Sequence, residues 1–502
     1  MKKINLLILF LVTFLFLNIS CKKGNEPPVP PNPENPNKYV NDWIYENMNI
    51  YYYWNDKIPS EPDYTQTSDK FFKSLLNTYD KNSNPHGDRF SWIQESYVDL
   101  LKNLGGVTSD EIGFEYVPVD VSPEGATTKQ YYLLVLYPKL GTDAYAKGVK
   151  RGRFVVKIDN QDITNNNYKT LISGTGSKTL TFADWAYNND TKKYELKLAA
   201  NTITIQMHKD FAEKPVYLDS VYTINDKKIG YLVYNFFAKD KGDDSHEYDK
   251  MLMNSLGKIK AKGATEFVLD LRYNGGGAVS SAIALASALV KNRSTENLLV
   301  SAEYNPLVNN ELKKQYGNGY NKEFFIDKIV SKNQTIAEVP ALNLPRVYIL
   351  VSRWTASASE LIINGLKPYM DIVLIGETTV GKNVGSITIY EKDDAKNKWG
   401  MQPIIVKYFN SAGKSDFTAG FVPDYPLSEQ ENLMLVEFGK TEDIFLNKAL
   451  SVIIGAPLKS STRMAKIDTS FNLKAVEHSS SMKITGMYDD VRQEALQNMM
   501  KK

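Results

Sequence analysis

From Val216 onward, apolar strand-like runs alternate with helical stretches, and this alternation constrains the fold of the chain more than any other feature. Strands separated by helices form largely parallel sheets, and ligands bind at the carboxyl ends of such strands. The sequence therefore predicts an α/β core with a mainly parallel sheet within residues 213–455. The expected strands are residues 228–237, Glu266–Leu271, Arg346–Val351 and Asp371–Gly376, and the expected helices are about Tyr248–Ala261 and two that begin near Val279 and Ser357.

Two further regions precede this core. Residues 39–98 carry apolar and aromatic side chains at helical spacing, which predicts a small helical N-terminal domain. Residues 99–212 contain several short strand patterns and one helical piece, Thr142–Val149, which predicts a β-rich domain. The predicted fold class is therefore multidomain α+β. Residues 456–502 are polar and irregular, and no structure or role is assigned to them.

The N-terminus has the features of an export signal. Lys2 and Lys3 precede an apolar run that is too short to span a bilayer and that ends at Ser20-Cys21. Residues 1–20 resemble a bacterial lipoprotein signal peptide, which implies lipid attachment at Cys21. The alternative is an ordinary secretory signal with a stray cysteine. The chain is thus expected in the bacterial cell envelope, lipid-anchored and facing the periplasm, with the cell surface as the other location.

Composition predicts the form of the segment after Cys21 and excludes several classes of site. Residues 21–38 are proline-rich and predict an extended tether between the anchor and the body. Cys21 is the only cysteine and there are 4 histidines, which exclude zinc fingers, iron–sulfur clusters and cysteine catalysis by the mature body. The net charge of +2 gives no field that would favour nucleic acid. We expect no metal, no cofactor and no nucleic-acid partner, and contact with a membrane only through the lipid anchor.

Three consecutive glycines, Gly275–Gly277, follow the strand Glu266–Leu271 in the motif DLRYNGGG. Glycine allows positive φ and lets backbone N–H groups approach an anion without interference from side chains. The motif predicts an oxyanion hole or a phosphate cradle, and the alternative is a plain turn between strand and helix. A P-loop is disfavoured because no Gly-Lys-Ser/Thr follows.

A second motif, TASASE, places Ser357 at the start of an apolar helix. The positive end of a helix dipole stabilises developing negative charge, so a serine hydroxyl there is a candidate nucleophile. The alternative interpretation is a capping box, because Ser357 and Glu360 have the spacing of one and a capping box needs no catalysis.

A third motif, GETTVGK, places Lys382 in a glycine-flanked turn after the strand Asp371–Gly376. To act as a general base near neutral pH, a lysine must lower its pKa from about 10.4 to about 7, which requires burial. The alternative is a solvated surface lysine.

Taken together, the three motifs resemble the C-terminal processing (tail-specific) peptidases, which use a Ser-Lys dyad. The motifs stand in the family's order, and 25 residues separate Ser357 from Lys382, as in that family. The resemblance implies that Ser357 is the nucleophile and Lys382 the general base, with Glu360 as a supporting residue. It also implies an oxyanion hole, and the residues whose N–H groups would form it are Gly275, Gly276 and Ala358.

The β-rich region adds to this resemblance. Ile112-Gly113-Phe114 resembles the carboxylate-binding loop of a PDZ domain, and residues 137–163 resemble its later segment. A PDZ domain binds a C-terminal peptide as an added strand, so the implied partners are unfolded or flexible protein C-termini. The resemblance spans about 39–455, with the helical N-terminal domain at 39–98, the PDZ-like domain at 99–212 and the peptidase domain at 213–455.

Two departures from the family leave a third catalytic residue open. Members place an acid 11 residues after the serine or a glutamine four residues after the lysine, and these positions hold Pro368 and Ser386 here. A non-catalytic tail-binding module on the same fold is therefore the main alternative function. A penicillin-recognising hydrolase is a weaker one, because Ser-x-x-Lys occurs three times without its companion motifs.

Overall fold

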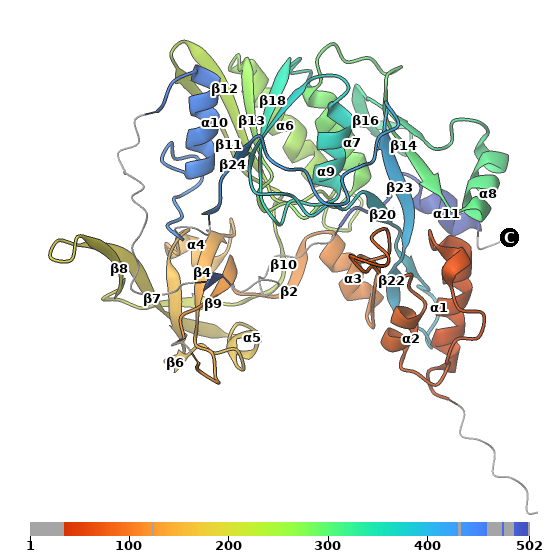
Figure 1. Cartoon of the computed structure of the whole chain (residues 1–502), viewed down its shortest axis with the longest axis horizontal. Helices are drawn as coiled ribbons and strands as arrows, with labels where there is room; N and C mark the ends of the chain where they lie inside the picture. The colour runs from red at the N-terminus through yellow and green to blue at the C-terminus, as the bar shows by residue number, and fades with distance from the viewer. Residues whose placement is uncertain (1–34, 123–124, 430–432, 459–473, 476–485, 500–502) are drawn as a thin grey trace, which may run out of the picture.

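The computed structural model describes residues 35–122, 125–429, 433–458, 474–475 and 486–499 (Figure 1). The expected signal peptide, Cys21 and most of the tether lie outside the described residues. An α/β core forms the upper half of the molecule in Figure 1, and two smaller regions lie beneath it: a β-rich one and a mainly helical one.

The core is built on a six-stranded sheet with the order β11-β12-β13-β18-β19-β24. Its strands are β11 (Val216–Ile224), β12 (Lys227–Tyr234), β13 (Glu266–Asp270), β18 (Arg346–Val351), β19 (Asp371–Gly376) and β24 (Tyr425–Pro426). β11 pairs antiparallel with β12, and every other neighbouring pair is parallel. This is the mainly parallel sheet that the alternating pattern predicts.

Helices cover both faces of this sheet. They are α6 (Glu247–Ala261), α7 (Val279–Leu289), α9 (Ala358–Leu366) and α10 (Ile444–Ile454). Because successive strand residues point to opposite faces, Leu269 and Ile349 pack with α6, α7 and α9, whereas Val268 and Leu350 pack with α10. Figure 1 shows α10 on one side of the sheet and α7 with α9 on the other.

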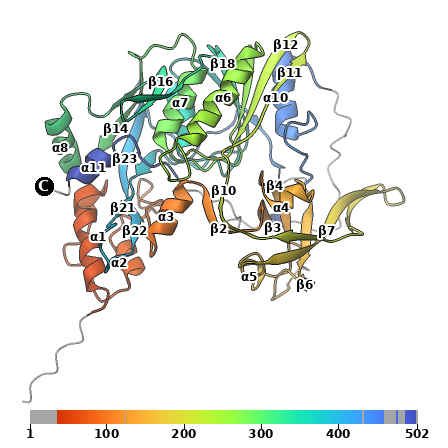
Figure 2. The same ribbon diagram turned by 180° about the vertical axis from the view of Figure 1, so that it is seen from behind.

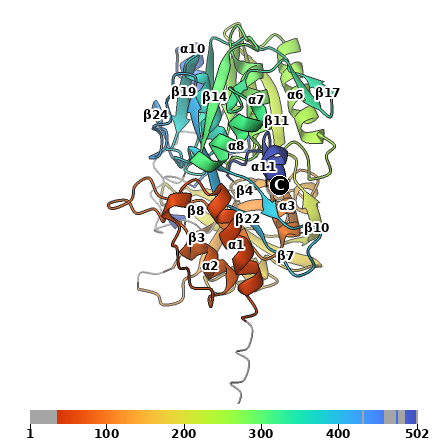
Figure 3. The ribbon, with the colours of Figure 1, turned by 90° about the vertical axis from the view of Figure 1, so that its right-hand side faces the viewer.

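An antiparallel sheet that the sequence patterns did not predict borders the core. Its order is β15-β14-β23-β20, formed by β15 (Lys322–Phe324), β14 (Leu298–Tyr304), β23 (Ile404–Asn410) and β20 (Val384–Ser386). Beside it lie α1 (Lys38–Tyr51), α2 (Ser68–Ser74) and α8 (Pro306–Tyr316), together with a small sheet of β1 (Trp92–Gln94), β22 (Gly400–Gln402) and β21 (Ile389–Tyr390). Figure 3 looks onto α1, α2 and α8.

The β-rich region has its own core and an antiparallel sheet of short and long strands. The main path is β25-β3-β4-β5-β7-β8, and α3 (Tyr97–Leu104) leads into it, as Figure 2 shows. Its elements are β3 (Phe114–Asp120), β4 (Tyr131–Pro138), α4 (Asp143–Ala146), β5 (Phe154–Ile158), β6 (Gln161–Asp162), α5 (Tyr168–Leu171), β7 (Ser177–Asn188), β8 (Lys193–Leu198) and β9 (Ile203–Gln206), and β2 (Val107–Glu111) pairs with β10 (His208–Ala212) beside it. The sequence patterns predicted only short strands here, and β7 is a strand of 12 residues.

Two parts of the unassigned C-terminal segment are described, and both pack against distant parts of the chain. β25 (Lys474–Ala475) pairs antiparallel with β3. Residues 486–499 end in α11 (Gln493–Met499), which lies next to α8 and α1 in Figures 1 and 3. The Tyr51 hydroxyl donates to the Leu496 carbonyl at 2.8 Å, so α1 contacts α11 directly.

Two observations concern membranes and metals. Among the described residues, no helix has both the length and the apolar character needed to cross a bilayer. Within the same residues, no cluster of at least three His, Cys, Asp or Glu side chains could hold a metal ion.

Candidate active site

Ser357 lies at the turn between β18 and α9, where it is the N-cap residue of α9. It is fully buried, and its φ of 65° is one that residues other than glycine rarely adopt. Its N–H donates to Glu360 Oε2 at 2.8 Å, while its Oγ accepts a hydrogen bond from the Met487 N–H. Ser357 and Glu360 form the capping box that their spacing predicts, and the Ser357 hydroxyl is buried. The capping and nucleophile interpretations are compatible, because Oγ also accepts from a group outside the helix.

Glu360 joins the serine turn to the lysine turn. Its carboxylate accepts from the N–H groups of Ser357 and Lys382 at 2.8 Å, from Gly381 N–H at 2.7 Å and from the Thr379 hydroxyl. Burial raises the pKa of Glu360, and these four donors oppose that effect by stabilising the carboxylate. One side chain therefore fixes the backbone at both candidate catalytic residues.

Lys382 is buried, as a general base requires, with only 3% of its surface exposed. Burial lowers its pKa to about 8, although Asp88 and Glu360 act in the opposite direction. The Nζ atom lies 4.9 Å from the centre of the Phe90 ring. Among the described residues no hydrogen bond joins Lys382 Nζ to Ser357 Oγ, whose partner here is Met487.

The glycine turn lies directly against Ser357. Gly276 has φ 103°, and a Cβ at this position would come within 2.8 Å of Ser357 Cβ, so only glycine fits. Its N–H donates to Asn274 Oδ1 at 2.9 Å. In the described part of the chain, no residue accepts a hydrogen bond from the Ala358 N–H, which lies at the start of α9.

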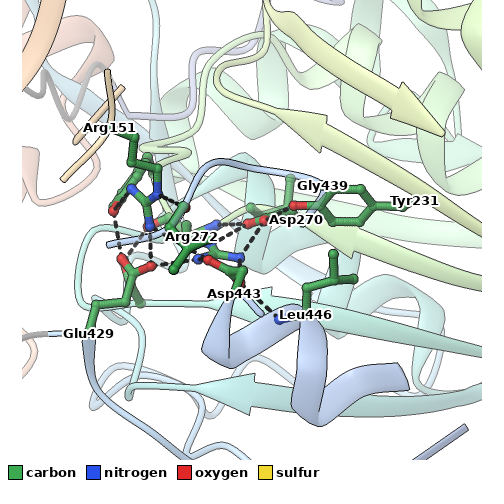
Figure 4. Close-up of polar contacts among 12 residues, drawn as sticks. Arg151, Tyr231, Asp270, Arg272, Glu429, Gly439, Asp443 and Leu446 are labelled. Atoms are coloured by element: carbon green, nitrogen blue, oxygen red, sulfur yellow. Dashed lines mark hydrogen bonds and ion pairs between the residues drawn. The ribbon is translucent and has the colours of Figure 1, made fainter. Parts of the chain in front are cut away.

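A buried ionic network holds the strand end that precedes this turn (Figure 4). Arg272 donates to both carboxylate oxygens of Asp270 and of Asp443 and to Glu429. Arg151, from the β-rich region, also donates to Glu429. The network therefore joins the β-rich region to the strand end from which the glycine turn starts.

Ser386 and Pro368 occupy the positions where the family often has a third polar residue. The Ser386 hydroxyl donates to Gln402 Oε1 at 2.6 Å, and no described hydrogen bond joins it to Lys382. Pro368 follows α9 and borders a surface pocket that is also lined by Lys367 and Phe421. Neither position therefore completes a triad in this structure.

The N-terminal region supplies residues that the sequence patterns did not reveal. Arg89 donates to the carbonyls of Gly381 and Thr418, both at 2.9 Å, and so ties its own loop to the lysine turn. Asp88 and Phe90 lie on either side of Arg89. The charge of Asp88 raises the pKa of Lys382, and the Phe90 ring lies next to Lys382 Nζ. No local pattern signals this role, because the loop is polar and is separated from the lysine turn by about 290 residues of sequence.

The loop Ile112-Gly113-Phe114 is buried where β2 leads into β3. The Gly113 N–H donates to Glu111 Oε1 at 2.7 Å, and the Glu111 carboxylate also pairs with the buried Lys139. A cavity of about 270 Å³ lies beside the loop. The Gly113 N–H is therefore occupied by an internal carboxylate in this structure.

A buried serine at a helix N-terminus and a buried lysine of lowered pKa, each in a turn that follows a parallel strand, are the groups that serine hydrolases with a lysine base use. The comparisons with known proteins agree with this class. Residues 228–427 match the model of peptidase family S41, and residues 39–92 match its N-terminal domain. The chain belongs to peptidase family S41, whose members are serine peptidases.

Individual relatives are distant but cover much of the chain. A carboxyl-terminal-processing protease of Picosynechococcus sp. is 24% identical over 76% of this chain and 82% of its own length. The carboxy-terminal processing protease CtpA of Bacillus subtilis is 23% identical over 58% of this chain and 52% of its own length. A crystal structure from Bacteroides fragilis NCTC 9343, named as that of a "Putative S41 protease", matches with a TM-score of 0.67 at 26% identity, over 86% of this chain and 99% of that one.

Proposed function

We propose that this protein is a serine endopeptidase that cleaves flexible C-terminal regions of other proteins through a dyad of Ser357 and Lys382. The observation that carries the proposal is the burial of a serine and of a lysine in two turns that one carboxylate joins, with the pKa of the lysine lowered to about 8. Glu360 supports it, because its carboxylate holds the backbone N–H groups of both residues.

In the proposed mechanism, neutral Lys382 takes the proton of Ser357 as Oγ attacks the carbonyl carbon of the substrate peptide bond. The Ala358 N–H, together with an N–H of the glycine turn at Gly275 or Gly276, stabilises the oxyanion. Lys382 then gives its proton to the leaving amine, and water hydrolyses the acyl-enzyme. Glu360 acts by positioning, since it contacts both turns and not the substrate.

The proposal extends to substrate selection and location. The PDZ-like region, with Ile112, Gly113 and Phe114 at its loop, would select tails by adding them to a sheet edge. The resemblance of residues 1–20 to a lipoprotein signal supports attachment at Cys21, which would keep the enzyme at the bacterial envelope, facing the periplasm. Flexible C-termini of envelope proteins are then the proposed substrates. The names of the relatives, which process carboxyl termini, support the same substrate class.

We expect the full chain, purified in detergent, to shorten an unfolded protein with an apolar C-terminus, and the Ser357→Ala variant to lose this activity by at least about a thousandfold. Mass spectrometry of the products measures both. The matched control is Ser359→Ala, a buried serine on the same helix whose hydroxyl donates to the Asn274 carbonyl at 3.1 Å. It should keep most of the activity. Equal cleavage by Ser357→Ala would refute the dyad, and tail binding without cleavage by any form would favour the non-catalytic alternative.

The lowered pKa of Lys382 also predicts a pH profile. Only the neutral amine accepts a proton, so kcat/KM, which reports the substrate-free enzyme, should rise from pH 6 to a plateau above about pH 9, about a hundredfold in all for a pKa of about 8. The measurement is kcat/KM across pH 6 to 10 with a short peptide that lacks titratable side chains. A kcat/KM that does not change over this range would contradict Lys382 as the base.

A further inference from the structure

The C-terminal stretch Gly486–Met487 lies directly over the candidate dyad. The Met487 N–H donates to Ser357 Oγ, and a Cβ at Gly486 would overlap Lys382 Nζ. Met487 itself is 1% exposed. The two groups that would react with a substrate are therefore covered by the chain's own tail.

On one side, this stretch pairs with the glycine turn as an extended strand would. Gly486 N–H donates to the Gly275 carbonyl at 3.3 Å, and Tyr488 N–H donates to the Gly277 carbonyl at 3.1 Å. The Tyr488 carbonyl accepts in turn from Val279 N–H at 3.2 Å. These are the backbone groups that flank the proposed oxyanion hole, so the stretch uses the edge that a substrate peptide would need.

On the other side, the same stretch pairs with the end of β20. Ser386 N–H donates to the Met487 carbonyl at 3.0 Å, and Asp489 N–H donates to the Ser386 carbonyl at 2.8 Å. The stretch thus forms backbone hydrogen bonds on both of its edges, as a peptide does when it adds to a sheet as a strand. Such binding depends little on the side chains of the peptide, which suits a protease cleft.

Side chains further along the tail anchor this arrangement. Asp490 accepts from the N–H and the hydroxyl of Ser280 at the N-terminus of α7, where the helix dipole favours a carboxylate. Arg492 pairs with Asp489 and with Glu323, and the Tyr304 hydroxyl donates to Asp489 at 2.7 Å. The tail is therefore docked through buried polar contacts as well as through its backbone.

The contact with Ser357 is not one from which a peptide bond can be attacked. A peptide N–H lies in the plane of its amide, so an oxygen that accepts from it lies near that plane. A nucleophile must instead approach the carbonyl carbon from above the plane. Ser357 Oγ, engaged by the Met487 N–H, is thus held away from the carbonyl of Gly486, and the Gly486–Met487 bond is protected.

We propose that residues 486–492 are a peptide ligand bound in cis in the catalytic cleft, and that they keep the enzyme latent until a substrate tail displaces them. This inference rests on the proposed peptidase function. A tethered segment competes at an effective concentration in the millimolar range, so free substrates compete poorly with it. The pairing of β25 with the edge of β3 shows that the same tail also reaches the PDZ-like region.

The first test is Gly486→Val. A side chain there would overlap Lys382 Nζ, so the tail or the lysine side chain must shift, and valine also disfavours the φ of 71° at this position, which together weaken docking. We expect kcat/KM for a flexible substrate to rise at least about tenfold, because the tethered competitor is lost. The matched control is Gly413→Val. Gly413 has the same φ of 71° as Gly486, but no atom lies within 4 Å of the position that a Cβ would take there. The Gly413→Val variant therefore has the same backbone strain without an overlap with another side chain, and it should cleave the substrate at the wild-type rate.

The second test removes the tail. A chain that ends at residue 485 should show the same gain, and a synthetic peptide of residues 485–499 added to it should restore inhibition in a saturable way without being cut. The intact mass of the full chain should include residue 487 and all that follow. Equal rates for wild type, Gly486→Val and the shortened chain, or cleavage after Gly486, would overturn latency and leave the peptidase standing. Failure of every form to cleave would overturn the peptidase itself, and the inference with it.

Discussion

The Lys382→Met variant should be inactive and yet more stable than the wild-type protein, by about 3 kcal/mol at pH 7. The pKa of Lys382 is lowered from 10.5 to about 8 because its ammonium group is buried. Keeping that proton in the folded state costs about 1.4 kcal/mol for each of the roughly 2.5 pKa units. Methionine has a similar length and no charge, so it removes this cost and keeps the packing against Phe90.

The pH dependence of this stability difference tests its cause. Between about pH 8 and 10.5 the unfolded chain binds more protons at Lys382 than the folded chain does, so the stability of the wild type rises with pH in that window. The advantage of Lys382→Met should therefore be full below pH 8 and should vanish near pH 10.5.

Urea unfolding at pH 7, 9 and 10.5 measures this difference. The control is Lys314→Met, whose side chain is 79% exposed and whose replacement should change stability by less than about 0.5 kcal/mol. A destabilised Lys382→Met variant at pH 7 would show that the ammonium is satisfied in the folded state, contrary to the prediction.

The second large effect is expected at Arg272. Its guanidinium is 1% exposed and pairs with three carboxylates, those of Asp270, Glu429 and Asp443. Burial alone would lower its pKa, but these carboxylates outweigh burial and keep it well above its usual value. Arg272→Met leaves the carboxylates buried with Arg151 as the remaining cation, which should cost about 3–5 kcal/mol of stability.

Activity should fall with this variant even where it remains folded, because the glycine turn starts at the strand end that Arg272 holds. Thermal and urea unfolding, together with a cleavage assay at a temperature well below the melting point, separate the two effects. The control is Arg153→Met, which breaks a bidentate pair with Asp184 whose carboxylate is 46% exposed. It should cost about 1 kcal/mol or less. Similar losses for both variants would refute the special role of the buried network.

Local sequence patterns predicted those elements whose formation depends on neighbours in the chain. Arg346–Val351 and Asp371–Gly376 are strands with the predicted bounds, and α7 begins at the predicted Val279. The position of Ser357 at a helix N-terminus and the burial of Lys382 also follow the prediction. These features depend on short apolar runs bounded by a glycine or a capping residue. Such runs involve only residues that are close in sequence, so each can be predicted separately.

The tertiary structure decided what depends on residues far apart in the sequence. The sheet of β14, β15, β20 and β23 pairs segments that no periodicity relates, and the loop of Asp88 and Phe90 meets Lys382 only after folding. Residues 486–492 are polar and irregular as a sequence, yet their backbone forms hydrogen bonds with the glycine turn on one side and with Ser386 on the other. Backbone hydrogen bonds of this kind are available to almost any residue. The sequence by itself therefore determined the strands, the helix and the candidate chemistry of Ser357 and Lys382, whereas only the folded chain could place its own tail across them.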